Sequence, residues 1–146
     1  MTERARFTPR VLLREGDAGG AAAIVECTVP PRWPGPPLHH HAFSEAFYVL
    51  DGELVFQLGD ELRIGTPGSF AFAGGGGVHT LANLSDFPAR YLLTITPAGF
   101  ERYFDRLAAE AAGIEPPAGA GQPYPETTVV GSSIPQDTDL RIARRL

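Results

Sequence analysis

HHHAFSE, the stretch at residues 39–45, contains three of the four histidines in this chain of 146 residues, and the fourth is His79. Alternate side chains of an extended strand point to the same face, so His39 and His41 share one face and His40 takes the other. The strand rise separates alternate residues by about 7 Å, which lets both imidazoles reach one ion. We therefore expect His40 to face away from this site and to serve in packing.

A carboxylate and a distant histidine complete the candidate ligand set. A turn over residues 42–44 would bring Glu45 back beside the two histidines, and a barrel could place His79 opposite them. Three nitrogens and one carboxylate oxygen suit a divalent transition metal with one or two positions left open, and Fe, Mn, Ni, Co, Cu and Zn all accept such ligands. The predicted metal ligands are therefore His39, His41, Glu45 and His79. Scattered histidines are the alternative, and the HHH run alone would fit it.

Short strand-like segments surround these motifs and predict an all-β fold. Apolar residues alternate within them, and Gly, Pro, Asn and Asp separate them, which is typical of a sandwich or barrel. We expect Asp51-Gly52 to form a tight hairpin turn, because both residue types tolerate positive φ. The prolines of residues 32–37 exclude a central strand there. Nine strands are predicted in a closed or nearly closed barrel, at residues 11–14, 22–29, 38–42, 45–50, 53–58, 61–64, 69–73, 79–83 and 89–96.

The periodicity changes after the last predicted strand. Apolar residues then recur at helical spacing, so we predict an amphipathic helix at about residues 98–112, with Thr96 as its N-cap, Pro97 at its first position and Gly113 at its end. This helix is expected to cover the barrel wall. Residues 113–146 are rich in Pro, Gly, Ser and Thr, and only 127–130 look strand-like, so this tail should wrap the domain or pair with a second subunit. We thus expect one domain over residues 1–146, with its barrel core at about 20–97.

Composition excludes several classes of function. The chain has 17 acidic and 12 basic residues and a formal net charge of -5, so it offers no basic field for nucleic acid. No apolar run reaches the roughly 18 residues of a membrane span. Cys27 has no partner for an internal disulfide and is expected to be a small core residue. The first residues lack the apolar stretch of a secretory signal, so a cytoplasmic protein is expected.

The joint spacing of these residues resembles the two motifs of the cupin superfamily. The chain departs from that pattern at Trp33, where the first motif begins with glycine, and at Gly74, where the second motif has proline. The resemblance covers about residues 20–97 and implies a conical, jelly-roll-like antiparallel barrel with a metal inside. The matching residues are His39, His41, Glu45 and Gly52 in the first motif and Gly68, Gly76, His79 and Asn83 in the second. For Asn83 we expect a structural hydrogen bond rather than metal contact.

The segment GFERYF at residues 99–104 makes the chain similar to the single-barrel, quercetin dioxygenase-like cupins. That resemblance implies cleavage of a flavonol or similar enol by dioxygen, with Glu45 as the catalytic residue that accepts the substrate's hydroxyl proton. A metal-dependent isomerase or lyase is an alternative that needs no dioxygen, and a non-catalytic barrel that binds a small ligand is another. Some of the aromatic residues near the motifs should line a cavity for a flat substrate, although more should serve the core; these are Trp33, Phe43, Phe47, Phe70 and Phe72. Cupin-like barrels often pair edge to edge, so a homodimer is expected.

Overall fold

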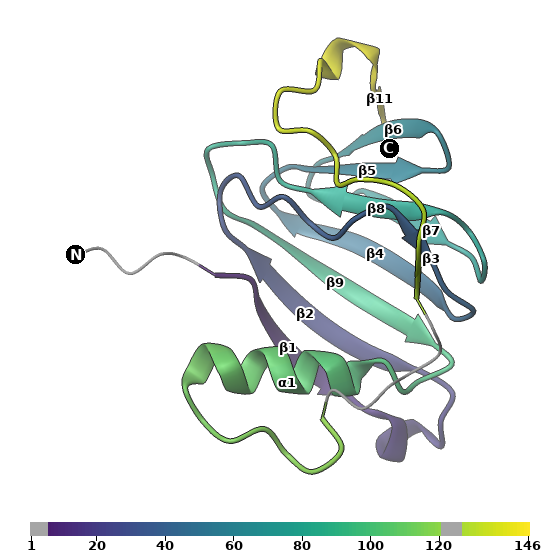
Figure 1. Cartoon of the computed structure of the whole chain (residues 1–146), viewed down its shortest axis with the longest axis vertical. Coiled ribbons are helices and arrows are strands. Elements are labelled where there is room, and N and C mark those ends of the chain that lie inside the picture. The colour runs from purple at the N-terminus through teal and green to yellow at the C-terminus, as the bar shows by residue number, and fades with distance from the viewer. Residues whose placement is uncertain (1–5, 121–126) are drawn as a thin grey trace.

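Two facing β-sheets and one α-helix make up the computed structural model, which describes residues 6–120 and 127–146 (Figure 1). The elements, in chain order, are β1 (Thr8–Leu13), η1 (Glu15–Ala18), β2 (Ala23–Val29), β3 (His39–His40), β4 (Ser44–Asp51), β5 (Leu54–Leu58), β6 (Glu61–Gly65), β7 (Phe70–Ala73), β8 (His79–Ala82), β9 (Ala89–Thr96), α1 (Glu101–Ala112), β10 (Thr128–Val129), η2 (Leu140–Ile142) and β11 (Arg144–Arg145). One sheet has the order β1-β2-β9-β4-β7 and the other β10-β3-β8-β5-β6-β11. The mostly β, barrel-like architecture with a helix after it is confirmed.

The core lies between the inner faces of the two sheets. Leu93 of β9 pairs with Val25 of β2 on one side and with Phe47 of β4 on the other, and all three side chains are buried. Cys27 is also fully buried on this inner face, as expected. Period-two alternation thus turns one row of apolar side chains from each strand into the core.

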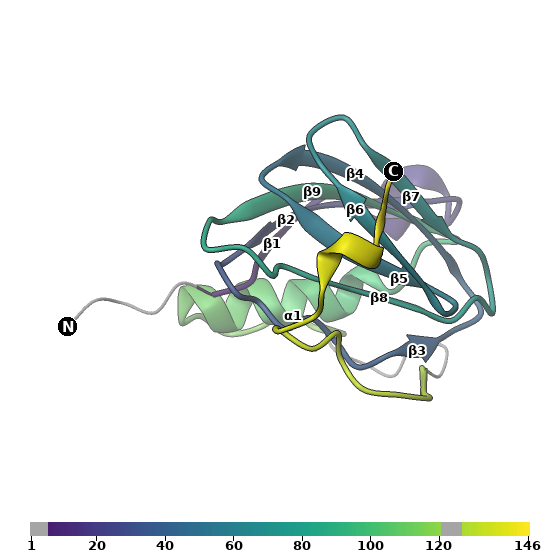
Figure 2. The ribbon, with the colours of Figure 1, turned by 90° about the horizontal axis from the view of Figure 1, so that it is seen from above.

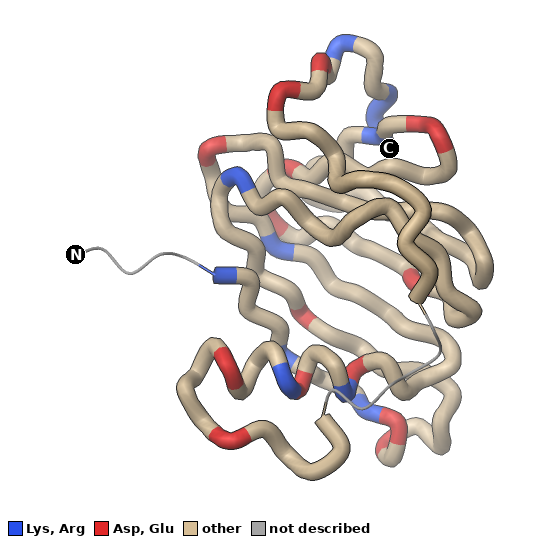
Figure 3. Tube along the Cα trace, in the orientation of Figure 1, with Lys and Arg blue, Asp and Glu red and all other residues tan. Residues whose placement is uncertain are grey.

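The tail covers part of the second sheet. Val55 of β5 points away from the main core, yet it is buried in a small apolar cluster with Ile134 and Leu84. β10 pairs antiparallel with β3, and β11 pairs parallel with β6. The described part of the tail therefore wraps its own domain. Charged residues of both signs occur along this tail and around α1 (Figure 3).

The predicted hairpin at Asp51-Gly52 is wrong. β4 pairs with β7 and β9, whereas β5 pairs with β6 and β8, so the turn carries the chain from one sheet to the other. Gly52 has φ 74°, and a Cβ there would lie 2.5 Å from the carbonyl oxygen of Pro88. The positive φ was correctly expected, but the close approach shows that the glycine serves a corner between sheets.

The start of the helix also differs from the prediction. Thr96 is the last residue of β9 and cannot cap α1, which begins at Glu101. The Glu101 carboxylate is 1% exposed and accepts hydrogen bonds from the backbone N–H groups of Gly99 and Glu15, the latter at 2.6 Å. α1 ends as predicted, since Gly113 adopts the left-handed conformation with φ 68°. The helix packs against β1 and β2 (Figures 1 and 2). Neither it nor any other described helix is long and apolar enough to cross a membrane.

Candidate metal centre

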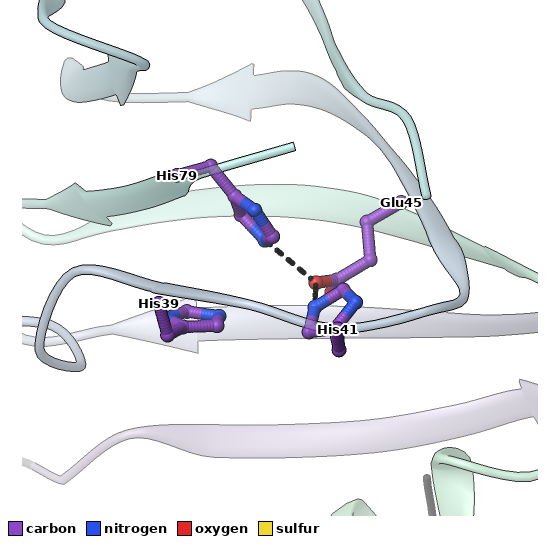
Figure 4. Close-up of side chains that lie close together, drawn as sticks. All are labelled: His39, His41, Glu45 and His79. Atoms are coloured by element: carbon purple, nitrogen blue, oxygen red, sulfur yellow. Dashed lines mark hydrogen bonds and ion pairs between the residues drawn. The ribbon is translucent and has the colours of Figure 1, made fainter. Parts of the chain in front are cut away.

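Four side chains converge inside the barrel (Figure 4): three come from strands of the two sheets, and His41 comes from the connection between β3 and β4. His39 of β3 pairs directly with His79 of β8 in the second sheet. The chain then bends at Ala42 and Phe43, in the region where a turn was expected, and enters β4 of the first sheet, which carries Glu45. One ligand atom from each of His39, His41, Glu45 and His79 lies within 4.8 Å of the other three, and all four residues are buried. The convergence predicted from the spacing is confirmed.

Backbone carbonyls hold the three imidazoles in one tautomer. Nδ1 of His39 donates to Pro37 O at 2.7 Å, Nδ1 of His41 donates to Phe43 O at 2.8 Å, and Nδ1 of His79 donates to Gly77 O at 2.8 Å. A carbonyl oxygen can only accept a hydrogen bond, so each Nδ1 carries the proton. In the neutral rings Nε2 then keeps its lone pair, and this is the form in which histidine binds a metal.

Glu45 supplies the negative charge of the cluster. Its Oε1 lies 2.7 Å from Nε2 of His41 and 3.0 Å from Nε2 of His79. Burial would raise the pKa of the Glu45 carboxyl, but the hydrogen bonds from these two histidines outweigh it and lower this pKa to about 2. Burial lowers the pKa of His39. Burial would also lower the pKa of His79, but the hydrogen bond with Glu45 outweighs burial, so the pKa of His79 is raised. The carboxylate is therefore ionised at neutral pH.

The donor set fits a divalent transition metal. Both nitrogens of His41 and of His79 face acceptor oxygens, although a neutral imidazole can donate from only one of them. The two Nε2 atoms and Oε1 of Glu45 thus require positive charge between them, as protons or as a metal ion. Three imidazole nitrogens and one carboxylate oxygen are ligands that Fe, Mn, Ni, Co, Cu and Zn accept. The buried cluster could therefore hold such an ion, with open positions for a further ligand.

A pocket of about 690 Å³ leads from this cluster toward α1. His39 and Glu45 form part of its wall. Most of the remaining wall is apolar and aromatic, with side chains from the N-terminal segment, the proline-rich loop, the first sheet and the helix: Phe7, Trp33, Phe47, Tyr91, Phe100, Tyr103 and Phe104. The site thus combines a polar end, where a metal could be bound, with an aromatic body that suits a flat ligand.

The aromatic predictions were correct only in part. Trp33 and Phe47 line the pocket, whereas Phe43 stacks on His41 with a centroid distance of 3.6 Å. Phe70 and Phe72 are each 56% exposed, so they belong neither to the pocket nor to the core. Their positions on β7 alternate with buried alanines, and this alternation points them outward.

The helix is part of the site, which its sequence did not reveal. Tyr103, Phe104 and Leu107 line the pocket from α1, together with Phe100 directly before the helix. The apolar stripe that carries them predicts packing against the barrel wall and gives no sign of a pocket. Nothing in helical periodicity distinguishes a face that seals a core from one that closes a pocket.

Two further motif residues have the predicted structural places. His40 pairs with Thr128 of β10, and the strand alternation turns it away from His39. Asn83 is fully buried and donates hydrogen bonds to Pro30 O at 3.1 Å and Phe87 O at 2.7 Å. Its structural role is confirmed, since it ties the loop after β2 to the loop between β8 and β9.

Comparison with known proteins supports this architecture. Residues 25–95 match the family described as Cupin domain. No match was found among curated proteins. Among solved structures, a protein from Thermus thermophilus is similar with a TM-score of 0.56 and 23% identity, over 66% of this chain and 90% of that chain.

Two similar structures carry the names of enzymes. The DMSP lyase DddQ from Ruegeria pomeroyi has a TM-score of 0.55 and 28% identity, over 62% of this chain; this chain spans only about half of the lyase, 47% of its length. The polyketide cyclase RemF from Streptomyces resistomycificus has a TM-score of 0.55 and 21% identity, over 66% of this chain and 80% of that chain. At 21% identity the likeness to the cyclase shows the shared fold alone.

Proposed function

From the cupin domain that the chain carries at residues 25–95, we propose that the protein is a metal-dependent dioxygenase of the quercetinase-like kind. Its substrate would be a small aromatic or enolic molecule with a free hydroxyl group, and dioxygen would be the co-substrate. The observation that carries this proposal is that His39 and Glu45 stand at the polar end of a pocket whose remaining wall is mostly apolar and aromatic.

The shape and chemistry of the pocket select this class of substrate. A flat ring can lie against the aromatic walls formed by Trp33, Phe47 and Phe104, while its hydroxyl group points to the polar end. When bound by the four ligands, a divalent transition ion supplies Lewis-acid and redox chemistry at that end. A charged or highly hydrated substrate would lose its hydration on entering and would find few polar partners along the walls.

Glu45 is the residue that we propose to move a proton. Oε1 faces the imidazoles of His41 and His79, whereas Oε2 has no hydrogen-bond partner among the described residues. A carboxylate that uses one oxygen toward the metal site keeps the other to accept a proton from a substrate hydroxyl. The histidines cannot take this role, because their Nδ1 atoms are held by backbone carbonyls and their Nε2 atoms face the site.

A lyase or isomerase is the second candidate. The 28% identity with the DMSP lyase favours it, although this chain spans only 47% of that protein. The same Oε2 of Glu45 would then accept a proton from carbon, and dioxygen would not be consumed. The two candidates therefore share the site and the base and differ in the co-substrate.

An oxygen electrode separates them. Metal-free protein would be reloaded in parallel with Fe, Mn, Ni and Co and offered a panel of flavonols, catechols and 1,3-diketones. We expect one dioxygen molecule to be consumed for each substrate molecule, and no turnover under argon. Turnover of any panel member at the same rate under argon would overturn the dioxygenase in favour of the lyase or isomerase. The double variant His39→Ala/His41→Ala serves as the metal-deficient control.

A further inference from the structure

A segment of the C-terminal tail contributes Thr127 and Val129 to the lining of the pocket beside the candidate metal centre. We propose that this segment, residues 127–133 and here called the strap, forms one wall of the entrance, and that Val129 determines which substrates fit by their size. The proposal rests on the proposed function for the identity of the substrate, but the geometry of the strap is independent of it.

Backbone hydrogen bonds hold the strap on the strand that carries His39. β10 pairs antiparallel with β3, so that Val129 lies opposite His39 and Thr128 opposite His40. The N–H groups of Val130 and Gly131 donate to Leu38 O at 2.9 and 3.2 Å, and Leu38 N donates to Ser132 O at 3.3 Å. Figure 2 shows the yellow-green tail running beside β3. The strap is therefore an added edge strand of the second sheet.

Strand pairing decides which side chains of the strap face the pocket. Residues directly opposite each other in an antiparallel pair point to the same side, with Cβ atoms about 5 Å apart. Val129 thus lies on the side of His39, and both Val129 and Thr127 line the pocket. Thr128 and Val130 alternate with them and point to the other side.

The strap also supports a strand that has little other support. β3 consists of two residues, and its pairing with β8 is the single pair His39 and His79. On its other edge, β10 supplies two further pairs. A side chain at position 129 therefore sits on a fixed backbone next to a metal-ligand residue.

The strap presents no charge to the entrance. Its sequence, TTVVGSS, contains neither acidic nor basic residues. Val129 is 59% exposed. A valine is small enough to leave the entrance wide for a ring. A tryptophan on the same backbone would extend into the pocket without disturbing a packed core, since the native side chain is more than half exposed.

Two probes of different size test this inference on full-length protein loaded with Co²⁺. Azide is small, and 4-nitrocatechol carries a ring; both bind open metal positions and are followed by absorbance. We expect Val129→Trp to weaken 4-nitrocatechol binding by about tenfold or more, the scale of a misfit in an apolar pocket, and to leave azide binding within about twofold. The matched control is Val130→Trp, a neighbouring valine on the opposite face, which should bind both probes like the unmodified protein.

The outcomes separate the strap from the metal. Equal loss of 4-nitrocatechol binding in both tryptophan variants, or unchanged binding in Val129→Trp, would overturn the role of Val129. If Val129→Trp weakens azide binding as much as 4-nitrocatechol binding, the substitution acts on the metal centre instead. That result also overturns the role of Val129. If the unmodified protein binds no Co²⁺, the proposed function fails, and the strap is then tested on metal-free protein with the uncharged aromatic dye N-phenyl-1-naphthylamine. For the inference to stand, Val129→Trp must bind the dye more weakly than the unmodified protein does, and Val130→Trp must bind it equally well.

Discussion

Replacing His39 and His41 together with alanine should abolish tight metal binding. The two residues supply half of the four donor atoms that lie within 4.8 Å of one another. Their removal leaves Glu45 and His79, which are too few to hold a transition ion against water. His40 provides the matched control, because it is the same residue type between the two and faces away.

The expected loss can be bounded from the geometry. Disturbing a group that only orients a metal ligand already costs about 10- to 100-fold in affinity, so losing two direct ligands should cost more than about 10²- to 10⁴-fold. A ligand present at 1,000 times its dissociation constant stabilises the folded state by about 4 kcal/mol. For a domain of this size each kcal/mol corresponds to about 2–4 °C in Tm. The unmodified protein should thus gain about 8–16 °C on metal addition. A 10²-fold weaker site would leave the double variant a gain of about 3–6 °C, and a 10⁴-fold weaker site almost none.

Elemental analysis and isothermal titration with Zn²⁺ or Co²⁺ measure these quantities. We expect close to one ion per chain in the unmodified protein and in His40→Ala, and none that survives desalting in His39→Ala/His41→Ala. Stoichiometric metal in the double variant would refute the ligand assignment. Loss of metal in His40→Ala, with circular dichroism unchanged, would refute the strand alternation on which the assignment was based.

Three further variants probe the base, the helix anchor and the assembly. Glu45→Gln keeps one coordinating oxygen, so it should retain its metal but lose about 10²-fold or more in kcat; full turnover with metal bound would show that the proton goes elsewhere. Glu101→Ala removes the acceptor of two backbone N–H groups and should lower the free energy of unfolding in urea by about 2–6 kcal/mol, at about 1–3 kcal/mol for each group, whereas the exposed Glu110→Ala should change it little. The homodimer stays a prediction: β7 is an uncharged edge strand with Phe70 and Phe72 each 56% exposed, so Phe72→Glu should convert a dimer to a monomer in light scattering, and a monomeric unmodified protein at micromolar concentration would count against it.

The clustering of the four candidate ligands was predictable because it depends on local rules. The period of two along a strand separates His40 from its neighbours without any knowledge of the fold. The need for a bend before Glu45 follows from its spacing, and the chain does bend at Ala42 and Phe43. Only the approach of His79 required an assumption about topology, and the motif resemblance supplied it.

The parts that could not be predicted depend on which strands pair. Asp51-Gly52 has the composition of a hairpin, but β4 and β5 belong to different sheets, and no local signal distinguishes a hairpin from a corner. The same limit applies to β5, which carries apolar side chains on both of its faces. Its outer face, where Val55 lies, is apolar because the tail covers it. The tail's partner strands are far away in sequence, so its path is set by tertiary packing alone.

Trp33 shows how a departure from the motif can become part of the site. The backbone there keeps its contact with the second motif, since Asn83 N donates to Trp33 O at 2.9 Å. The glycine requirement is met two residues later, where Gly35 has φ 69° and a Cβ would lie 1.7 Å from Leu81 O. The position is thus free to carry a side chain, and the indole stacks on Phe7 at 5.1 Å and lines the pocket. The loop needs a glycine only at residue 35. It therefore gains an aromatic pocket wall at residue 33, where the glycine of the motif would offer no side chain.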